Sequence, residues 1–194
     1  KLECYEAELR RWQKVVNLVA PSTLDEIWHR HFADSAQLTE FIPPDARHLA
    51  DVGSGGGFPG LVLATVLAES RDIRVTLVES DTRKAAFLRE TARRMEIPVE
   101  ILSTRIESNA SVQALIDVDI VVARAFAPLR RLLSLVFPVF SYRTVGVFLK
   151  GRDIAHEIDR AREDWAFEVE LHESVTDKEG RMAVIRRLAR KPEV

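Results

Sequence analysis

The sequence predicts an α/β fold with a mostly parallel sheet of seven strands and a helical extension at its N-terminus. Two observations predict it. From position 47 onward, short apolar runs alternate with stretches of helical length, which is the pattern of a parallel sheet covered by helices. After the last of these stretches, two apolar runs follow with only a short turn between them, which indicates an antiparallel hairpin. With 194 residues, the chain is long enough for one well-buried domain and a short extension.

The N-terminal helical extension is expected to cover residues 1–46. Apolar residues recur every three or four positions from Leu2 to Val19, which predicts one amphipathic helix that a proline then ends. Thr23 and Glu26 have the spacing of a capping box, so a second helix is expected to follow and to run to about Phe41. We expect the apolar faces of both helices to pack on the core domain.

The core domain is expected over residues 47–194. Buried parallel strands are predicted at residues 48–52, 75–79, 99–103, 120–125 and 145–150. A last helix over residues 153–165 precedes the hairpin strands, 167–173 and 182–188. Together these runs give the seven strands of the predicted sheet.

The composition narrows the class of protein. With 46% hydrophobic and 30% charged residues, the chain is too apolar to be disordered, and no run of apolar residues is long enough to cross a membrane. Cys4 is the only cysteine, which excludes an internal disulfide, and no charged-then-apolar leader opens the sequence. We expect a soluble, cytoplasmic monomer that does not bind membranes.

A glycine-rich turn, Asp51–Gly60, joins the first core strand to the next helix and predicts a cofactor site. Glycines allow a sharp turn and a close approach of the backbone to a ligand, and the free amides of the following helix face the same ligand. The spacing of its glycines fits the binding motifs of two cofactor classes. Gly55, Gly57 and Gly60 fit the dinucleotide fingerprint, whereas an acidic-Gly-x-Gly-x-Gly signature of S-adenosylmethionine (SAM) methyltransferases fits positions 51, 53, 55 and 57.

Two features favour SAM over a dinucleotide or a purely structural turn. Gly53 directly follows the strand, and the antiparallel hairpin is typical of class I SAM-dependent methyltransferases, which are Rossmann-like. Glu79 ends the second strand, where its carboxylate can accept hydrogen bonds from the ribose hydroxyls of an adenosyl group. The alternative for Glu79 is a cap of the helix that begins at Thr82.

Five short motifs also occur in order along nearly the whole chain: Trp12–Leu18, Arg30–Ser35, the glycine turn, Arg124–Phe126 and Leu149–Gly151. Together they resemble the RsmG (GidB) family of bacterial 16S rRNA methyltransferases. The resemblance implies that SAM is used to methylate N7 of a guanine, guanine 527 in the usual rRNA numbering. It also implies 16S rRNA as the partner, within the small ribosomal subunit or an assembly intermediate.

The same resemblance implies a set of cofactor-binding residues. In that family the SAM site uses the first glycine of the turn, the residue before its proline, a residue pair after the third strand, and the arginine of an Arg-Ala-Phe motif. These positions are Gly53, Phe58, Ile106 with Glu107, and Arg124. The chain departs from many relatives in reading Ser-Gly-Gly-Gly-Phe-Pro for Thr-Gly-Pro-Gly-Leu-Pro in the turn, and in having Glu79 where they have Asp. Both changes keep the chemistry.

The chemistry of guanine N7 agrees with the sequence. N7 has an in-plane lone pair and no proton, so correct positioning suffices, and we expect no catalytic general base. The chain lacks the Asn/Asp-Pro-Pro-Tyr/Phe motif that aligns exocyclic amines for methylation. Its cysteine lies in the first helix, away from the position of the nucleophile that methylation of pyrimidine C5 requires. Because the product base is a cation, Phe126 is a candidate for stacking on it, with a core phenylalanine as the alternative.

A basic segment from Arg124 to Arg152 contains six basic residues and no acidic one. It includes the ends of two strands at the carboxyl edge of the sheet, where the cofactor is expected. Lys150 and Arg152 are therefore candidates for RNA binding, although ordinary solvated faces would have the same composition. The alternatives are a SAM methyltransferase that acts on another RNA, a small molecule or a protein, and a noncatalytic SAM-binding module. A small-molecule enzyme would be expected to carry an apolar lid, and a noncatalytic module would not need the basic segment.

The sequence contains one candidate metal site, formed by His29, His31 and Asp34, but their spacing argues against it. On a helix, the two histidines point about 200° apart, so they cannot share one ion, and we expect no metal. His31 and Asp34 do share a face. They are expected to hydrogen-bond each other and brace the extension, or, for His31, to contact the RNA substrate.

Overall fold

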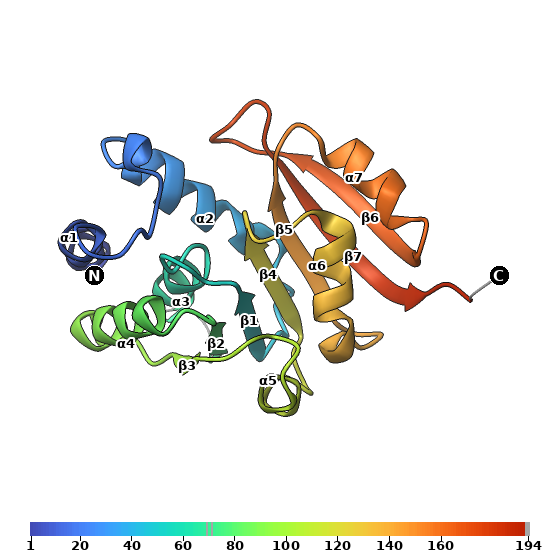
Figure 1. The fold of residues 1–194 in the computed structure, drawn as a ribbon, viewed down its shortest axis with the longest axis horizontal. Coiled ribbons are helices and arrows are strands. Elements are labelled where there is room, and N and C mark those ends of the chain that lie inside the picture. Colours follow the sequence, from blue (N-terminus) through green and yellow to red (C-terminus); the bar gives the residue numbers. More distant parts are fainter. Residues whose placement is uncertain (69, 71, 193–194) are drawn as a thin grey trace.

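The computed structural model describes residues 1–68, 70 and 72–192 of the chain, and a seven-stranded sheet forms its centre (Figure 1). The strand order is β3-β2-β1-β4-β5-β7-β6. The parallel strands are β1 (His48–Val52), β2 (Arg74–Val78), β3 (Glu100–Leu102), β4 (Ile120–Arg124) and β5 (Val145–Lys150). The antiparallel hairpin consists of β6 (Trp165–Glu173) and β7 (Arg181–Arg190), and β7 pairs with β5. The predicted mostly parallel sheet with a C-terminal hairpin is confirmed.

Helices cover both faces of the sheet. One layer contains α3 (Gly60–Leu67) and α4 (Thr82–Met95), and the other contains α5 (Asn109–Ala114), α6 (Leu129–Val136) and α7 (Ile154–Ala161), with the short turn η4 (Phe137–Val139) after α6. Successive residues of a strand point to opposite faces, so Leu49 belongs to the first hydrophobic cluster and Ala50 to the second. Burial on both faces explains why these strands are continuous apolar runs.

The order of the strands places a crevice at the carboxyl end of β1. The chain moves outward from β1 to β2 and β3, and then returns past β1 to β4 and β5. Loops leaving β1 and β4 therefore diverge to opposite sides of the sheet. In open α/β sheets, ligands bind at this switch point.

The N-terminal extension begins with α1 (Leu2–Gln13), which packs against α4. The prediction that this helix runs to Val19 is wrong. The Gln13 side-chain oxygen accepts hydrogen bonds from the amides of Leu18 (2.9 Å) and Val19 (3.1 Å), and its amide group donates to the Val19 carbonyl (2.8 Å). This side chain closes a loop, and the loop buries Val16 and Val19 without a helix.

The second helical stretch is irregular. It consists of the short turn η1 (Pro21–Thr23), the π-helical turn η2 (Trp28–Ala33), α2 (Asp34–Ala36) and η3 (Gln37–Phe41). The expected capping box is absent because the Thr23 hydroxyl donates to the Ala20 carbonyl (2.7 Å). The stretch does end at Phe41, as predicted.

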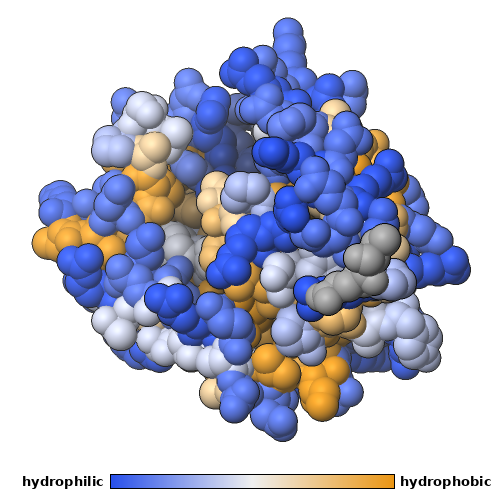
Figure 2. Space-filling view, turned by 45° about the vertical axis from the view of Figure 1, so that its right-hand side comes forward, coloured by the Kyte–Doolittle hydropathy of each residue, from blue (hydrophilic) through white to orange (hydrophobic). Residues whose placement is uncertain are grey.

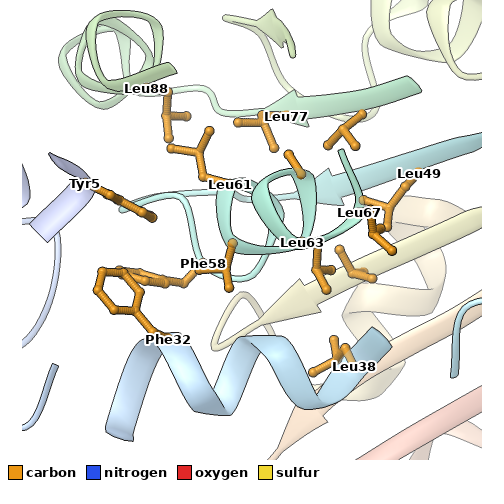
Figure 3. Close-up of a cluster of buried hydrophobic side chains, with 14 of the residues drawn as sticks. Tyr5, Phe32, Leu38, Leu49, Phe58, Leu61, Leu63, Leu67, Leu77 and Leu88 are labelled. Carbon is orange, nitrogen blue, oxygen red and sulfur yellow. The ribbon is translucent and has the colours of Figure 1, made fainter. Parts of the chain in front are cut away.

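The extension and the core share one hydrophobic cluster. Tyr5 of α1 and Phe32 of η2 point toward Phe58 of the glycine turn, and Leu38 lies below α3 (Figure 3). The ring centroids of Tyr5 and Phe58 are 5.1 Å apart, and those of Phe32 and Phe58 are 5.6 Å apart. The extension therefore packs directly behind the predicted cofactor turn. Among the described residues, no helix is both long and apolar enough to cross a membrane.

Candidate functional site

A cleft of about 440 Å³ lies at the carboxyl ends of β1 and β2, at the switch point of the sheet. Its volume falls in the range of small-molecule sites. Six of the residues predicted for the cofactor and the RNA line it: Gly53, Gly55, Glu79, Ile106, Glu107 and Phe126. Its other lining residues include three cations that the sequence analysis did not assign to the cofactor site, Lys84, Arg105 and Arg131.

The glycines of the turn have different roles. Gly53, Gly55 and Gly57 all have positive φ angles, of 72°, 54° and 87°, which favour glycine. A Cβ atom on Gly53 would lie 2.1 Å from the Phe126 ring, and one on Gly57 would lie 2.4 Å from the Tyr5 hydroxyl. A Cβ atom on Gly55 would meet only the Gly53 carbonyl, at 3.7 Å. Gly55 therefore borders open space in the cleft, whereas Gly57 faces the extension behind it.

Glu79 fixes the turn and borders the cleft. One carboxylate oxygen accepts a hydrogen bond from the Gly55 amide (2.8 Å), and the other accepts one from the Asp81 amide (2.7 Å). The cap of α4 is Asp81, whose side chain accepts from the amides of Arg83 and Lys84. Glu79 is thus not the helix cap. Its carboxylate keeps further lone pairs, which suit the two hydroxyls of a ribose.

Asp51 lies buried beneath the turn. One of its carboxylate oxygens accepts a hydrogen bond from the Gly60 amide (3.1 Å), and the other has no partner. Burial raises the pKa of Asp51 to about 7. An unpartnered buried oxygen favours a nearby hydrogen-bond donor. The open space at Gly55 and the carboxylate of Glu79, which border the cleft, fit the predicted cofactor.

Arg124 and Phe58 lie behind the cleft. The Arg124 guanidinium donates to Asp34 (3.2 Å) and to the Arg30 carbonyl (3.0 Å), and its central carbon lies 4.9 Å from the centroid of the Phe58 ring. Its third partner is Nδ1 of His31. Arg124 and Phe58, both predicted to bind the cofactor, therefore join the glycine turn to the N-terminal extension. The residues after Arg124, Ala125 and Phe126, line the cleft instead.

His31 is 8% exposed and is held on both sides. Nδ1 accepts from Arg124, and Nε2 lies 2.7 Å from the Thr23 hydroxyl. Burial, together with the charge of Arg124, lowers the pKa of His31 to about 4, so the ring is neutral at pH 7. The expected hydrogen bond between His31 and Asp34 is not formed, because both residues bind Arg124. In this structure His31 positions Arg124 and is not offered to RNA.

Phe126 is not a core residue. Its side chain lines the cleft over Gly53, and the residue is 37% exposed. Ile106, in contrast, is buried at the cleft wall, and Glu107 is exposed near Arg105, with 3.8 Å between their charged groups. An exposed ring beside a buried wall can accept a flat base.

The basic segment is largely neutralised by carboxylates from outside it. Lys150 is 9% exposed and binds Glu157 (2.8 Å) and the Ala127 carbonyl (2.6 Å), so its expected contact with a phosphate is not available. Arg152 pairs with Glu179 at 2.9 Å but stays exposed. Arg130 pairs with Glu163 and Asp164, and Arg124 pairs with Asp34. Within the described residues, Arg131 and Arg143 are the segment's two cations without a carboxylate partner.

The unassigned residues of the site had weak signals in the sequence. Tyr5 is an ordinary member of an amphipathic helix, and its contact with the turn depends on the packing of the extension. Lys84 and Arg105 are cations that follow β2 and β3, and the rule that ligands bind at the carboxyl ends of the strands was the one signal that placed them near the cofactor.

Comparisons with known proteins agree with the site. The family model of GidB, rRNA small subunit methyltransferase G, matches residues 1–187. Proteins named ribosomal RNA small subunit methyltransferase G from Parvibaculum lavamentivorans and Methylorubrum extorquens are each 47% identical to this chain. Both alignments cover 97% of the chain, and they cover 82% and 88% of these relatives.

Solved structures of low sequence identity share the fold. A SAM-dependent methyltransferase from Aquifex aeolicus matches with a TM-score of 0.62 and 13% identity, over 93% of this chain and 96% of that one. A variant of MtNAS in complex with SAM matches with a TM-score of 0.61 and 12% identity, over 95% and 72%. The predicted class I fold is thereby confirmed, and the family and the fold together confirm SAM as the cofactor. This chain belongs to the rRNA small subunit methyltransferase G (GidB) family.

Proposed function

We propose that this protein methylates N7 of a guanine in 16S rRNA, the guanine numbered 527 in the usual rRNA numbering. The observation that carries the proposal is the cleft, in which a cofactor turn and an exposed aromatic ring meet in a chain that belongs to this family over residues 1–187. The names of its relatives support small-subunit rRNA as the substrate. We propose that the protein acts in the cytoplasm as a monomer. Its substrate is the small ribosomal subunit or an assembly intermediate of that subunit.

The residues around the turn bind and orient the cofactor. Gly55 leaves room beside the backbone, and Glu79 accepts hydrogen bonds from the ribose, while Ile106 provides an apolar wall for the adenine. Asp51 supports the turn from behind, because its carboxylate accepts a hydrogen bond from the Gly60 amide. When bound, SAM supplies a sulfonium methyl group, whose bond to sulfur breaks as its bond to N7 forms, with the electron pair returning to sulfur.

The chain has to position the base and does not have to remove a proton. N7 attacks with its own lone pair, so neither Glu79 nor Glu107, the two acidic residues that line the cleft, needs to act as a base. Phe126 stacks on the guanine and stabilises the positive charge that the base acquires. Lys84, Arg105 and Arg131 hold the neighbouring phosphates at the rim.

Mass spectrometry of rRNA nucleosides tests this proposal. Small-subunit rRNA from cells with the gene should contain one more 7-methylguanosine than rRNA from cells without it, and fragment mapping should place it at the proposed guanine. Identical methylation patterns in the two RNAs would contradict the proposal. They would favour a small-molecule substrate or a noncatalytic SAM-binding role.

A further inference from the structure

A groove of about 1070 Å³ runs between helices α6 and α7, on the side of α6 away from the cofactor cleft. Residues of α6 and of the turn after it form one wall, including Arg130, Ser134 and Phe137. The opposite wall comes from α7, with His156 and Arg160, and the end of β7 closes the groove with Arg190 and Lys191. None of these residues has a role in the cofactor site.

Helix α6 separates the groove from the cleft, and Arg131 borders both. The helical period explains this division. Arg130 and Ser134 are four positions apart and share the face toward α7, whereas Arg131 and Leu135 share the face toward the cofactor cleft. A nucleic-acid strand that crosses α6 at Arg131 would therefore pass directly from one cavity into the other.

The charges of the groove favour an anionic occupant. Five basic and three acidic side chains line it. All three acids are engaged: Glu163 and Asp164 with Arg130, and Glu157 with Lys150. By contrast, Arg131 and Arg160 have no carboxylate partner among the described residues, and the Lys191 ammonium donates to a carbonyl, that of Arg162. These three cations keep their charge for a ligand.

The groove also has an aromatic surface suited to a base. Phe137 is 36% exposed and packs at 5.0 Å, between ring centroids, on the buried ring of Trp165. An exposed ring between cations is the arrangement that binds single-stranded nucleic acid, because bases stack on the ring while the cations contact phosphates. Figure 2 shows one face of the molecule, which is mostly hydrophilic with hydrophobic patches among the hydrophilic residues.

We propose that the groove between α6 and α7 binds the single-stranded RNA next to the target nucleotide. Arg131 guides the strand over α6, Arg160 and Lys191 contact phosphates, and Phe137 stacks on a base. This inference rests on the proposed function, since it supplies the path of the same RNA beyond the cleft. It also gives a role to Arg131, which borders both the groove and the cleft.

The double variant Arg160→Ala/Lys191→Ala tests the proposal. Its affinity for a small-subunit RNA fragment that contains the target should fall at 0.1 M salt, and the slope of log affinity against log salt should decrease in magnitude by about 0.7 for each lost phosphate contact. Calorimetry should give the same SAM affinity as for the wild type, since neither residue borders the cleft. The Michaelis constant for RNA should rise with little change in kcat.

The matched control is Arg89→Ala/Arg143→Ala. Both arginines are exposed, and within the described residues neither has a carboxylate partner, but Arg89 lies on α4, Arg143 precedes β5, and neither lines the groove or the cleft. This control should bind RNA as the wild type does. The groove proposal would be overturned if the groove variant bound free RNA with the same salt slope as the wild type. If such a variant still methylated whole subunits poorly, the occupant of the groove would be a ribosomal protein. Failure of the wild type to methylate rRNA would instead overturn the proposed function.

Discussion

Arg124, at the end of β4, and Asp34, in α2, form an ion pair of 3.2 Å although 90 residues separate them in the sequence. Their side chains are only 16% and 17% exposed. The pair fixes the start of the loop that carries Phe126 into the cleft. It therefore links the packing of the extension to the geometry of the cofactor site.

A double-mutant cycle of Arg124→Ala and Asp34→Asn should measure this link. Each change leaves its partner without a counter-charge, and we expect each to lower the free energy of unfolding by about 2 kcal/mol, with a coupling energy of about 1 kcal/mol. The measurement is urea unfolding, with SAM calorimetry beside it, and Arg124→Ala should also weaken SAM binding without RNA. Arg152→Ala, which breaks the exposed pair with Glu179, should cost less than about 1 kcal/mol. Additive effects of the two changes would mean that Arg124 and Asp34 do not act together.

Gly55→Val should abolish SAM binding while the protein stays folded. The new side chain would fill open space in the cleft, and the positive φ angle of 54° would cost about 1 kcal/mol. Calorimetry with SAM measures the loss of binding, and circular dichroism checks the fold. Gly151→Ala is the control, because a Cβ atom there meets nothing within 4 Å. Normal SAM affinity in Gly55→Val would show that the turn is not the cofactor site.

The stability of the protein should depend on pH through His31. Its pKa is about 4 in the folded protein and about 6.5 in an unfolded chain. Below pH 6.5 the unfolded chain takes up a proton that the folded protein does not, so this residue makes stability fall from pH 6.5 to pH 4. At pH 5 the loss is about 2 kcal/mol at most.

Urea unfolding of the wild type and His31→Gln, at several pH values, isolates this contribution. His48, whose pKa is also lowered to about 4, is present in both proteins and cancels in the comparison. The variant should lose less stability than the wild type between pH 6.5 and pH 4. The same pH slope in both proteins would mean that His31 is not buried and neutral in the folded state.

Lys150→Ala should act on stability and not on the binding of phosphates. The change leaves Glu157 without its counter-charge and frees the Ala127 carbonyl at the start of the loop before α6. We expect a loss of about 1 to 3 kcal/mol in the free energy of unfolding, with an unchanged salt slope for RNA binding. Thermal unfolding and RNA titrations measure the two quantities. A smaller salt slope at full stability would place Lys150 at the RNA after all.

Local patterns predicted the fold because they are consequences of burial. The strands are buried on both faces, so β1 and β4 appear as apolar runs, and the glycines at 53, 55 and 57 mark positive φ angles that other residues disfavour. The end of α1 was missed because it depends on one side chain, Gln13, that binds backbone groups five and six residues ahead. No periodicity encodes such a bond.

The partners of the charged residues were the least predictable part of the site. The basic segment contains no acidic residue, but Glu157 follows it closely, Glu163 and Asp164 lie beyond it, and Asp34 comes from the extension. Charge counted along a segment therefore overstates the charge that reaches solvent. The cofactor turn was easier to predict, because its function depends on consecutive residues.

Methyl transfer to an RNA that carries 7-deazaguanine tests the central claim most directly. In 7-deazaguanine a C–H group replaces N7, so the base keeps its shape and its pairing edge but loses the attacking lone pair. With labelled SAM and reconstituted small-subunit RNA, the account predicts transfer of one methyl group to the natural guanine and none to the 7-deaza base at the same position. Equal transfer to both RNAs would contradict it, because the methyl group would then go to another atom or another nucleotide.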